Sequence, residues 1–157
     1  MATTEDRARG SELSDRRADN LGEVRASIAT GLVKLHSKYY GKGPTQARTY
    51  MWDDLVVAVL RGGFTTVEET LVREGQEDTV HHMRRSFQKA MADEFRSVVE
   101  QATGRKVHAY LSQIHATQGV AAEVFVLEPE GGEAEHSTPG PLVDGGGPDP
   151  SRPEQDA

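Results

Sequence analysis

The sequence feature that most constrains the fold is an unbroken apolar run at residues 55–60, which lies between two turn signals. The adjacent carboxylates Asp53 and Asp54 precede it and favour a tight turn, because short acidic side chains bond nearby backbone N–H groups. Gly62 and Gly63 follow it closely. A short, valine-rich run between turns predicts a strand. Its lack of polar alternation predicts that other parts of the protein cover both of its faces.

Three further strands are predicted. Residues 46–52 mix aromatic, β-branched and polar side chains, which is typical of a half-exposed strand, and they would pair with residues 55–60 across the acidic turn. Residues 106–115 and 120–128 form a second pair of strand-like segments, joined by the short connection at residues 116–119. The sequence therefore predicts two hairpins.

Three helices are predicted around these hairpins. Residues 17–40 carry an apolar side chain at every third or fourth position, which predicts an amphipathic helix that ends in the glycine-rich residues 41–44. Thr65 and Glu68 match a capping box that would start a short helix. Residues 77–103 carry a second apolar stripe. A helix of that length is about 40 Å long, so we expect it to project or to pack against another copy of the chain.

The order α-β-β-α-α-β-β predicts an α+β fold, in which a four-stranded, mainly antiparallel sheet carries helices on one face in two layers. Residues 17–129 are predicted to form this single domain. Residues 1–16 are charged and poor in apolar side chains, and residues 130–157 are rich in glycine, proline and acidic residues. Both segments are predicted to be disordered, the second as an acidic tail.

The net charge of −7 arises mostly in residues 130–157, which carry seven acidic side chains and one arginine, whereas residues 21–129 carry 13 of each sign. A neutral domain argues against nucleic-acid binding, which requires clustered Lys and Arg. The chain has no cysteine, which excludes disulfides and thiolate chemistry. No apolar run approaches the roughly 20 residues of a membrane span, and no secretory signal is present. We therefore expect a cytoplasmic protein without direct membrane insertion.

Two glycine loops hold the candidate ligand-binding residues. Lys42 and Gly43 lie in the first loop, and Arg61 and Gly62 lie in the second. The first loop has the composition of a phosphate cradle. A Walker A loop leads from a strand into a helix, however, whereas here a helix precedes and a strand follows. A turn that simply ends the helix is the alternative interpretation.

Tyr40 and Trp52 are the candidate partner-surface residues, since aromatic side chains bury large areas at low entropy cost. Asp53, Asp54 and His115 could perform acid–base chemistry if the fold brought them together. A solvated turn is the alternative interpretation of the two aspartates. No two histidines have a metal-ligand spacing, so neither a metal nor a cofactor is predicted.

Three stretches of the sequence together resemble a known family. They are residues 33–45 (VKLHSKYYGKGPT), residues 55–65 and 67–71 (LVVAVLRGGFT and VEETL), and residues 103–107, 111–113 and 123–129 (TGRKV, LSQ and EVFVLEP). In this order they resemble, over residues 21–129, the family of small soluble proteins that belong to the membrane-potential-generating system. The resemblance implies a role beside a membrane antiporter-like protein and a large soluble protein, in sodium translocation or inorganic-carbon uptake. It implies no catalytic residue, and the acidic tail lies outside it.

The leading hypothesis is a non-enzymatic accessory or regulatory protein, a homodimer linked to a membrane Na⁺-translocating or bicarbonate-uptake system. It would be cytoplasmic and would reach the membrane through a partner among the transport subunits. The alternative is a small-anion or nucleotide sensor that uses Lys42 and Arg61. An enzyme built on Asp53, Asp54 and His115 ranks third.

Overall fold

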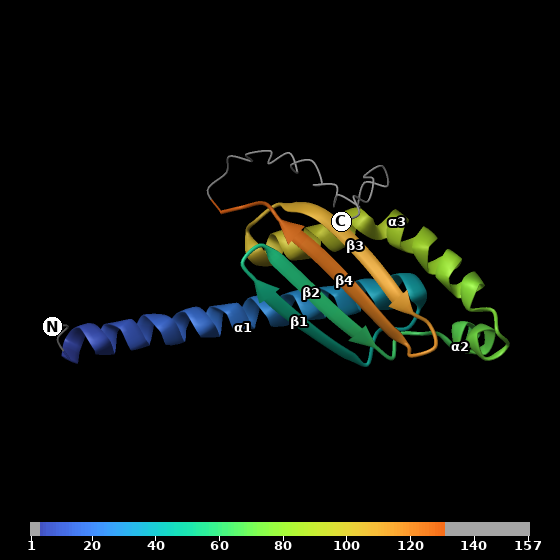
Figure 1. The fold of residues 1–157 in the computed structure, drawn as a ribbon, viewed down its shortest axis with the longest axis horizontal. Coiled ribbons are helices and arrows are strands. Elements are labelled where there is room, and N and C mark those ends of the chain that lie inside the picture. The colour runs from blue at the N-terminus through green and yellow to red at the C-terminus, as the bar shows by residue number, and fades with distance from the viewer. Residues whose placement is uncertain (1–3, 131–157) are drawn as a thin grey trace, which may run out of the picture.

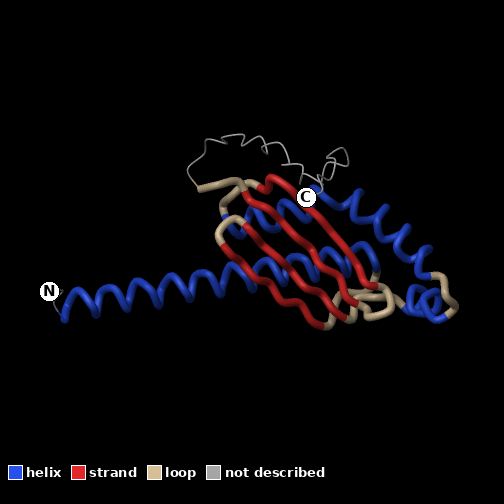
Figure 2. Tube along the Cα trace, in the orientation of Figure 1, coloured by secondary structure: helices blue, strands red, loops and turns tan. Residues whose placement is uncertain are grey.

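The computed structural model describes residues 4–130 of the chain. Its elements follow the predicted order (Figures 1 and 2). They are α1 (Thr4–Tyr40), β1 (Gln46–Trp52), β2 (Leu55–Arg61), α2 (Thr66–Arg73), α3 (Glu77–Thr103), β3 (Val107–His115) and β4 (Val120–Leu127). The predicted acidic tail lies outside the described residues apart from its first residue.

The four strands form one antiparallel sheet in the order β1-β2-β4-β3. Each predicted hairpin pairs its own two strands, and β2 pairs with β4 to join the hairpins. Figure 1 shows α1 and α3 behind the sheet, with no helix of the described chain in front of it. The predicted α+β fold with helices on one face is therefore confirmed.

The core lies between the sheet and its helices as two clusters of buried apolar side chains. The larger cluster joins α1 and α3 to the sheet and contains Phe95 and Phe125, both fully buried. The smaller cluster contains Leu60, Phe64 and Val80. Along β2 and β4, buried positions alternate with half-buried ones, because successive side chains of a strand point to opposite faces.

The prediction that residues 55–60 are covered on both faces is wrong for the single chain. Val56, Ala58 and Leu60 are buried against the helices, whereas Val57 and Val59 are only half-buried on the opposite face. Apolar side chains on both faces normally indicate two covering layers. Here the described chain supplies one layer and leaves an apolar outer face.

Helix α1 begins earlier than predicted. We expected it to start at about residue 17, after a disordered segment, whereas in the structure it begins at Thr4. Residues 9–20 are all exposed, and this half of the helix projects beyond the sheet (Figure 1). Its charged residues form no apolar stripe, so the periodicity that revealed the rest of α1 was missing here.

Local signals placed the other helix ends correctly. Thr65 caps α2 with both hydrogen bonds of the capping box. Helix α3 spans the predicted range and ends at Gly104, which adopts the left-handed conformation with φ of 69°. Helix α3 packs against α1 and β3. Its expected contact with another copy of the chain stays a prediction.

Replacing Phe95 by Ala should lower the free energy of unfolding by about 3–5 kcal/mol, because the ring is fully buried within the larger cluster. Phe87→Ala on the same helix is the control, since that ring is 37% exposed and should contribute clearly less. Urea unfolding followed by circular dichroism measures both. Equal losses for the two variants would contradict the packing described here.

Candidate functional site

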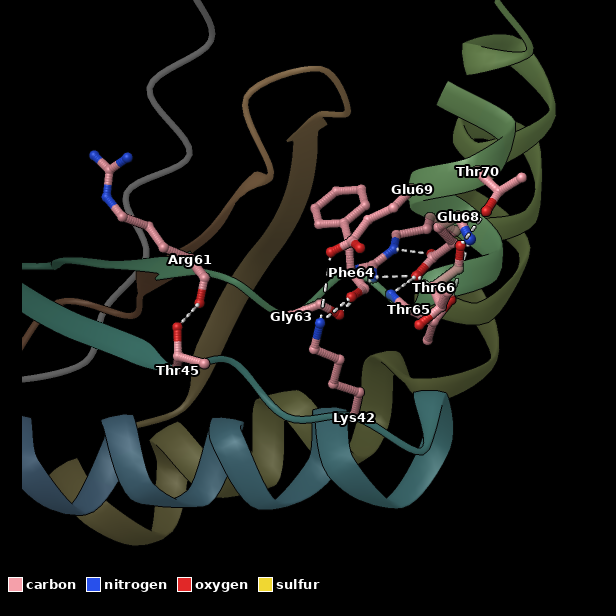
Figure 3. A network of polar contacts seen from close by, with 11 residues as sticks. Lys42, Thr45, Arg61, Gly63, Phe64, Thr65, Thr66, Glu68, Glu69 and Thr70 are labelled. Atoms are coloured by element: carbon pink, nitrogen blue, oxygen red, sulfur yellow. Dashed lines mark hydrogen bonds and ion pairs between the residues drawn. The ribbon is translucent and has the colours of Figure 1, made fainter. Parts of the chain in front are cut away.

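The two glycine loops, residues 41–45 and residues 61–65, interlock at one end of the sheet (Figure 3). The Nζ of Lys42 donates a hydrogen bond to the carbonyl oxygen of Phe64 at 2.6 Å and lies 3.5 Å from Glu69 Oε1. The backbone N–H of Thr45 donates to the carbonyl oxygen of Arg61 at 2.9 Å. The lysine of the first loop is therefore engaged with the second loop and with α2.

The glycines of these loops allow the close approach. Gly62 has φ of +70°, and a Cβ atom there would collide with the side chain of Thr45. A Cβ atom on Gly63 would lie 3.2 Å from Cγ of Pro44, tighter than ordinary contact. A Cβ atom on Gly43 would collide with the hydroxyl of Ser37 on α1. Gly43, Gly62 and Gly63 therefore serve the packing of the loops.

A buried ion pair lies directly behind the second loop. Arg84 of α3 and Glu68 of α2 are each only 1% exposed. The Nε of Arg84 donates to Glu68 Oε1 at 2.5 Å, and its Nη2 donates both to Glu68 Oε2 and to the carbonyl oxygen of Gly63 at 2.9 Å. Such a two-point pairing of guanidinium with carboxylate is the strong form of this interaction. It ties two helices and a loop together.

Aromatic rings and backbone groups complete the surroundings of this pair. The guanidinium carbon of Arg84 lies 4.1 Å from the ring centre of Phe64 and 4.3 Å from that of Tyr40. Glu68 Oε2 also accepts from the backbone N–H of Thr65 at 2.7 Å and from its hydroxyl at 2.9 Å. Burial by itself would raise the pKa of the Glu68 carboxyl, but the bonds from Arg84 and Thr65 together outweigh it and lower that pKa.

The residues predicted to bind a ligand do not converge. Figure 3 shows the guanidinium of Arg61 pointing away from Lys42. Arg61, Gly62 and Arg73 line a shallow pocket of about 390 Å³, and Lys42 does not line it. A ligand role for Lys42, Gly43, Arg61 or Gly62 stays a prediction, and the geometry favours the turn interpretation of the first loop.

The two predicted partner-surface residues lie in different places. Tyr40 is half-buried, with its ring over Arg84, and burial chiefly raises its pKa to about 12. Trp52 is 58% exposed at the far end of β1, where it stacks on Tyr50 with the ring centres 5.7 Å apart. Of the two, only Trp52 is on open surface.

The third-ranked hypothesis, an enzyme, required Asp53, Asp54 and His115 to converge, and they do not. The two aspartates form the turn between β1 and β2, beside the end of β2 that pairs with Val126. His115 pairs with Val120, at the other end of the sheet. Among residues 4–130, no group of three or more His, Asp or Glu side chains could hold a metal ion.

A buried polar group that we did not predict lies between the two core clusters. Glu123 is fully buried on β4, between Ala121 of the smaller cluster and Phe125 of the larger. The hydroxyl of Tyr110 donates to Glu123 Oε2 at 2.7 Å, and His36 Nε2 lies 3.4 Å from Glu123 Oε1. Burial, followed by the neighbouring charge of Glu123, raises the pKa of Tyr110. The one sequence signal was a glutamate at an inward position of an otherwise apolar strand.

The outer face of the sheet is a broad apolar feature outside the core. Its sixteen positions, read from the strand pairing, form four rows across the sheet. The rows are Trp52–Leu55–Val126–Ala109, Tyr50–Val57–Val124–Leu111, Arg48–Val59–Ala122–Gln113 and Gln46–Arg61–Val120–His115. The first two rows are entirely apolar or aromatic, and no row contains an acidic residue. A contiguous apolar patch of this kind on a protein surface indicates an interaction surface.

A separate groove of about 720 Å³ lies at the base of the projecting half of α1. Its walls come from Leu21 and Val24 of α1, from the acidic β1–β2 turn and from Arg105. Arg105 itself donates to the carbonyl oxygens of Asp53 and Glu128 at 2.7 and 2.6 Å. The guanidinium of Arg105, which forms part of the groove wall, is therefore already bonded to the backbone at the end of the sheet.

These features define a small two-layer α+β domain, held by interlocked glycine loops and presenting an uncovered sheet face. Residues 20–129 match the family described as MpsC, the Na⁺-translocating membrane potential-generating system. The match covers more than half of the chain, so the chain belongs to this family, as its sequence resemblance implied. No curated protein and no solved structure matches it. Within residues 4–130, no helix is long and apolar enough to cross a membrane.

Replacing Glu68 by Gln should lower the free energy of unfolding at pH 7 by about 3 kcal/mol, because it leaves the buried Arg84 charge without its counter-ion. Since the folded pKa of Glu68 is lowered from 4.5, its contribution is fully present above pH 4.5. The difference in the free energy of unfolding between wild type and variant should therefore become smaller as the pH falls below 4.5. Urea unfolding at a series of pH values measures it.

Glu69→Gln is the matched control, because Glu69 is the next residue along α2 and its side chain is 57% exposed. That variant should change the stability by less than about 1 kcal/mol. A gap for Glu68→Gln that stays constant from pH 7 to well below pH 4.5, or a loss in Glu69→Gln of the same size, would contradict the assignment.

Proposed function

We propose that this chain is a non-enzymatic accessory subunit of a Na⁺-translocating membrane system and that it acts by binding other proteins. Membership of the MpsC family supplies the link to the system. The same proposal makes the protein cytoplasmic, a homodimer, and peripheral to the membrane through its partners.

The use of the loop residues supports a role other than catalysis. In many enzymes, paired glycines and a lysine in a loop hold a phosphate group. Here Lys42 bonds the carbonyl oxygen of Phe64, and the guanidinium of Arg84 bonds Glu68 and Gly63. Asp53 and His115 stand at opposite ends of the sheet. Lys42 and Arg84 are thus engaged in contacts that hold the fold together.

The observation that carries the proposal is the apolar outer face of the sheet. It lies entirely within the part of the chain that matches the family. Exposed Trp52 and Leu111, at 58% and 57%, lie at its two edges. An apolar face of this kind, on a member of a family linked to a membrane system, supports a protein that functions by binding other proteins.

Affinity isolation from native membranes tests the proposal. The tagged full-length chain, produced in its own host and extracted in mild detergent, should recover membrane-embedded transport subunits that mass spectrometry identifies. The Lys42→Ala variant should recover them equally, because Lys42 braces the loops, although it should unfold more readily than wild type. Recovery of no membrane protein above an untagged control would contradict the accessory role. A folded Lys42→Ala variant that recovers none would instead make the loop a binding site.

A further inference from the structure

Side-chain size and polarity vary across the outer face of the sheet. Large aromatic side chains, Trp52 and Tyr50, lie on the edge strand β1, whereas Ala109 shares the row of Trp52 on the opposite edge strand β3. The central strands β2 and β4 contribute mostly valine. The polar side chains gather in the two rows furthest from the acidic turn, which contain Arg48 and Arg61.

We propose that a second copy of this chain covers this face, sheet against sheet, about a two-fold axis parallel to the strands. This inference rests on the proposed function, in which the chain acts by binding other proteins. It identifies a second copy of the chain as the protein that the outer sheet face binds. The helices of both copies then lie outside, so this dimer does not use the contact with another copy that was predicted for α3, and α1 to α3 remain free for the other proteins of the system. Two apolar sheets packed in this way lie about 10 Å apart, with interdigitated side chains.

Side-chain size is complementary under this axis. The rotation places β1 of one copy over β3 of the other, and β2 over β4. Trp52 then lies over Ala109 of the second copy and Tyr50 lies over Leu111, so a large residue meets a smaller one at each edge. In the centre, Val57 meets Val124. Alternating large and small side chains across facing positions is what close packing between two layers requires.

Charge is also compatible with a second copy under this axis. Arg48 would lie over Gln113 of the second copy and Arg61 over its Val120, so no arginine of one copy lies over an arginine of the other. The face carries no carboxylate, and both arginines lie in the two rows furthest from the acidic turn, so the two apolar rows meet without any charge between them. A two-fold axis perpendicular to the strands would instead place the two apolar rows over the rows that contain the arginines, with Arg61 over Leu55 and Arg48 over Tyr50, whereas the strand-parallel axis keeps the two apolar rows against each other. The strand-parallel axis is therefore the one that the face favours.

The face is large enough for a small interface between two copies. Four strands about 4.8 Å apart, with about seven residues that rise about 3.3 Å each, give a face of roughly 19 by 23 Å. The flat area is therefore about 440 Å², and projecting side chains add to it, which places the face below the roughly 800 Å² per partner of a standard specific interface and in the range of the smaller ones. A single two-stranded hairpin would offer half of this area.

Light scattering coupled to size exclusion, on the full-length chain over a range of concentrations, tests the inference. Wild type should show twice the chain mass. Val124→Asp, at the centre of the face, should show the mass of one chain with an unchanged circular dichroism spectrum. Val67→Asp is the matched control, because Val67 is a valine on α2, away from the face and 68% exposed; this variant should remain a dimer. If Val124→Asp does not fold, Leu111→Asp at the exposed edge replaces it.

Cysteine cross-linking tests the axis, because the chain has no native cysteine. A mixture of the Tyr50→Cys and Leu111→Cys variants, treated with a short bifunctional maleimide, should give a covalent dimer that contains one of each. Each variant alone should give far less. Strong cross-linking of Tyr50→Cys to itself would overturn the axis.

Two results would overturn the inference. One is a wild-type monomer at every concentration, which would leave the face to residues 131–157 or to a different protein. The other is a dimer that Val124→Asp and Leu111→Asp do not weaken. Neither result depends on the isolation of membrane proteins, so the dimer and the accessory role can fail separately.

Discussion

The paired contact between Arg84 and Glu68 is the interaction on which the rest of the structure depends. It joins α3 to the first turn of α2, and its third hydrogen bond holds the carbonyl oxygen of Gly63. With Gly63 fixed, the second glycine loop lies against Pro44 and the first loop. The first loop in turn connects α1 to β1. Removal of either charge would leave the other buried and unpaired, which costs far more than an exposed pair contributes.

The buried group of Glu123, Tyr110 and His36 plays a different part. Its members come from β4, β3 and α1, so it marks the place where the first helix meets the second hairpin. A shift of α1 by one turn would carry His36 about 5.4 Å away and leave Tyr110 as the one other member of this group beside Glu123. The apolar clusters on either side tolerate small shifts more readily than this polar contact does. The group therefore selects one alignment of helix and sheet.

Much of the fold could be predicted because its signals are local. The order of elements, the capping box at Thr65 and the end of α3 all follow from periodicity and turn chemistry within a few residues. The start of α1 could not, since a charged helix has no apolar stripe. Nor could the ion pair, whose members lie 16 residues apart on separate helices. For the candidate site, glycine spacing located the loops, but it could not reveal that Lys42 and Arg61 point apart. The apolar run at residues 55–60 predicted cover on both faces of the strand, but the described chain covers only one of them.

If a second copy covers the outer face of the sheet, Trp52 must lose its contact with water in the dimer. Trp52 is the only tryptophan of the chain, and it lies 58% exposed on that face in the single chain. The most direct measurement is its fluorescence, with acrylamide quenching, as the full-length protein is diluted. We predict blue-shifted, poorly quenched emission at high concentration, which becomes red-shifted and readily quenched as the dimer dissociates. Emission typical of a water-exposed tryptophan at every concentration would contradict the sheet-to-sheet dimer.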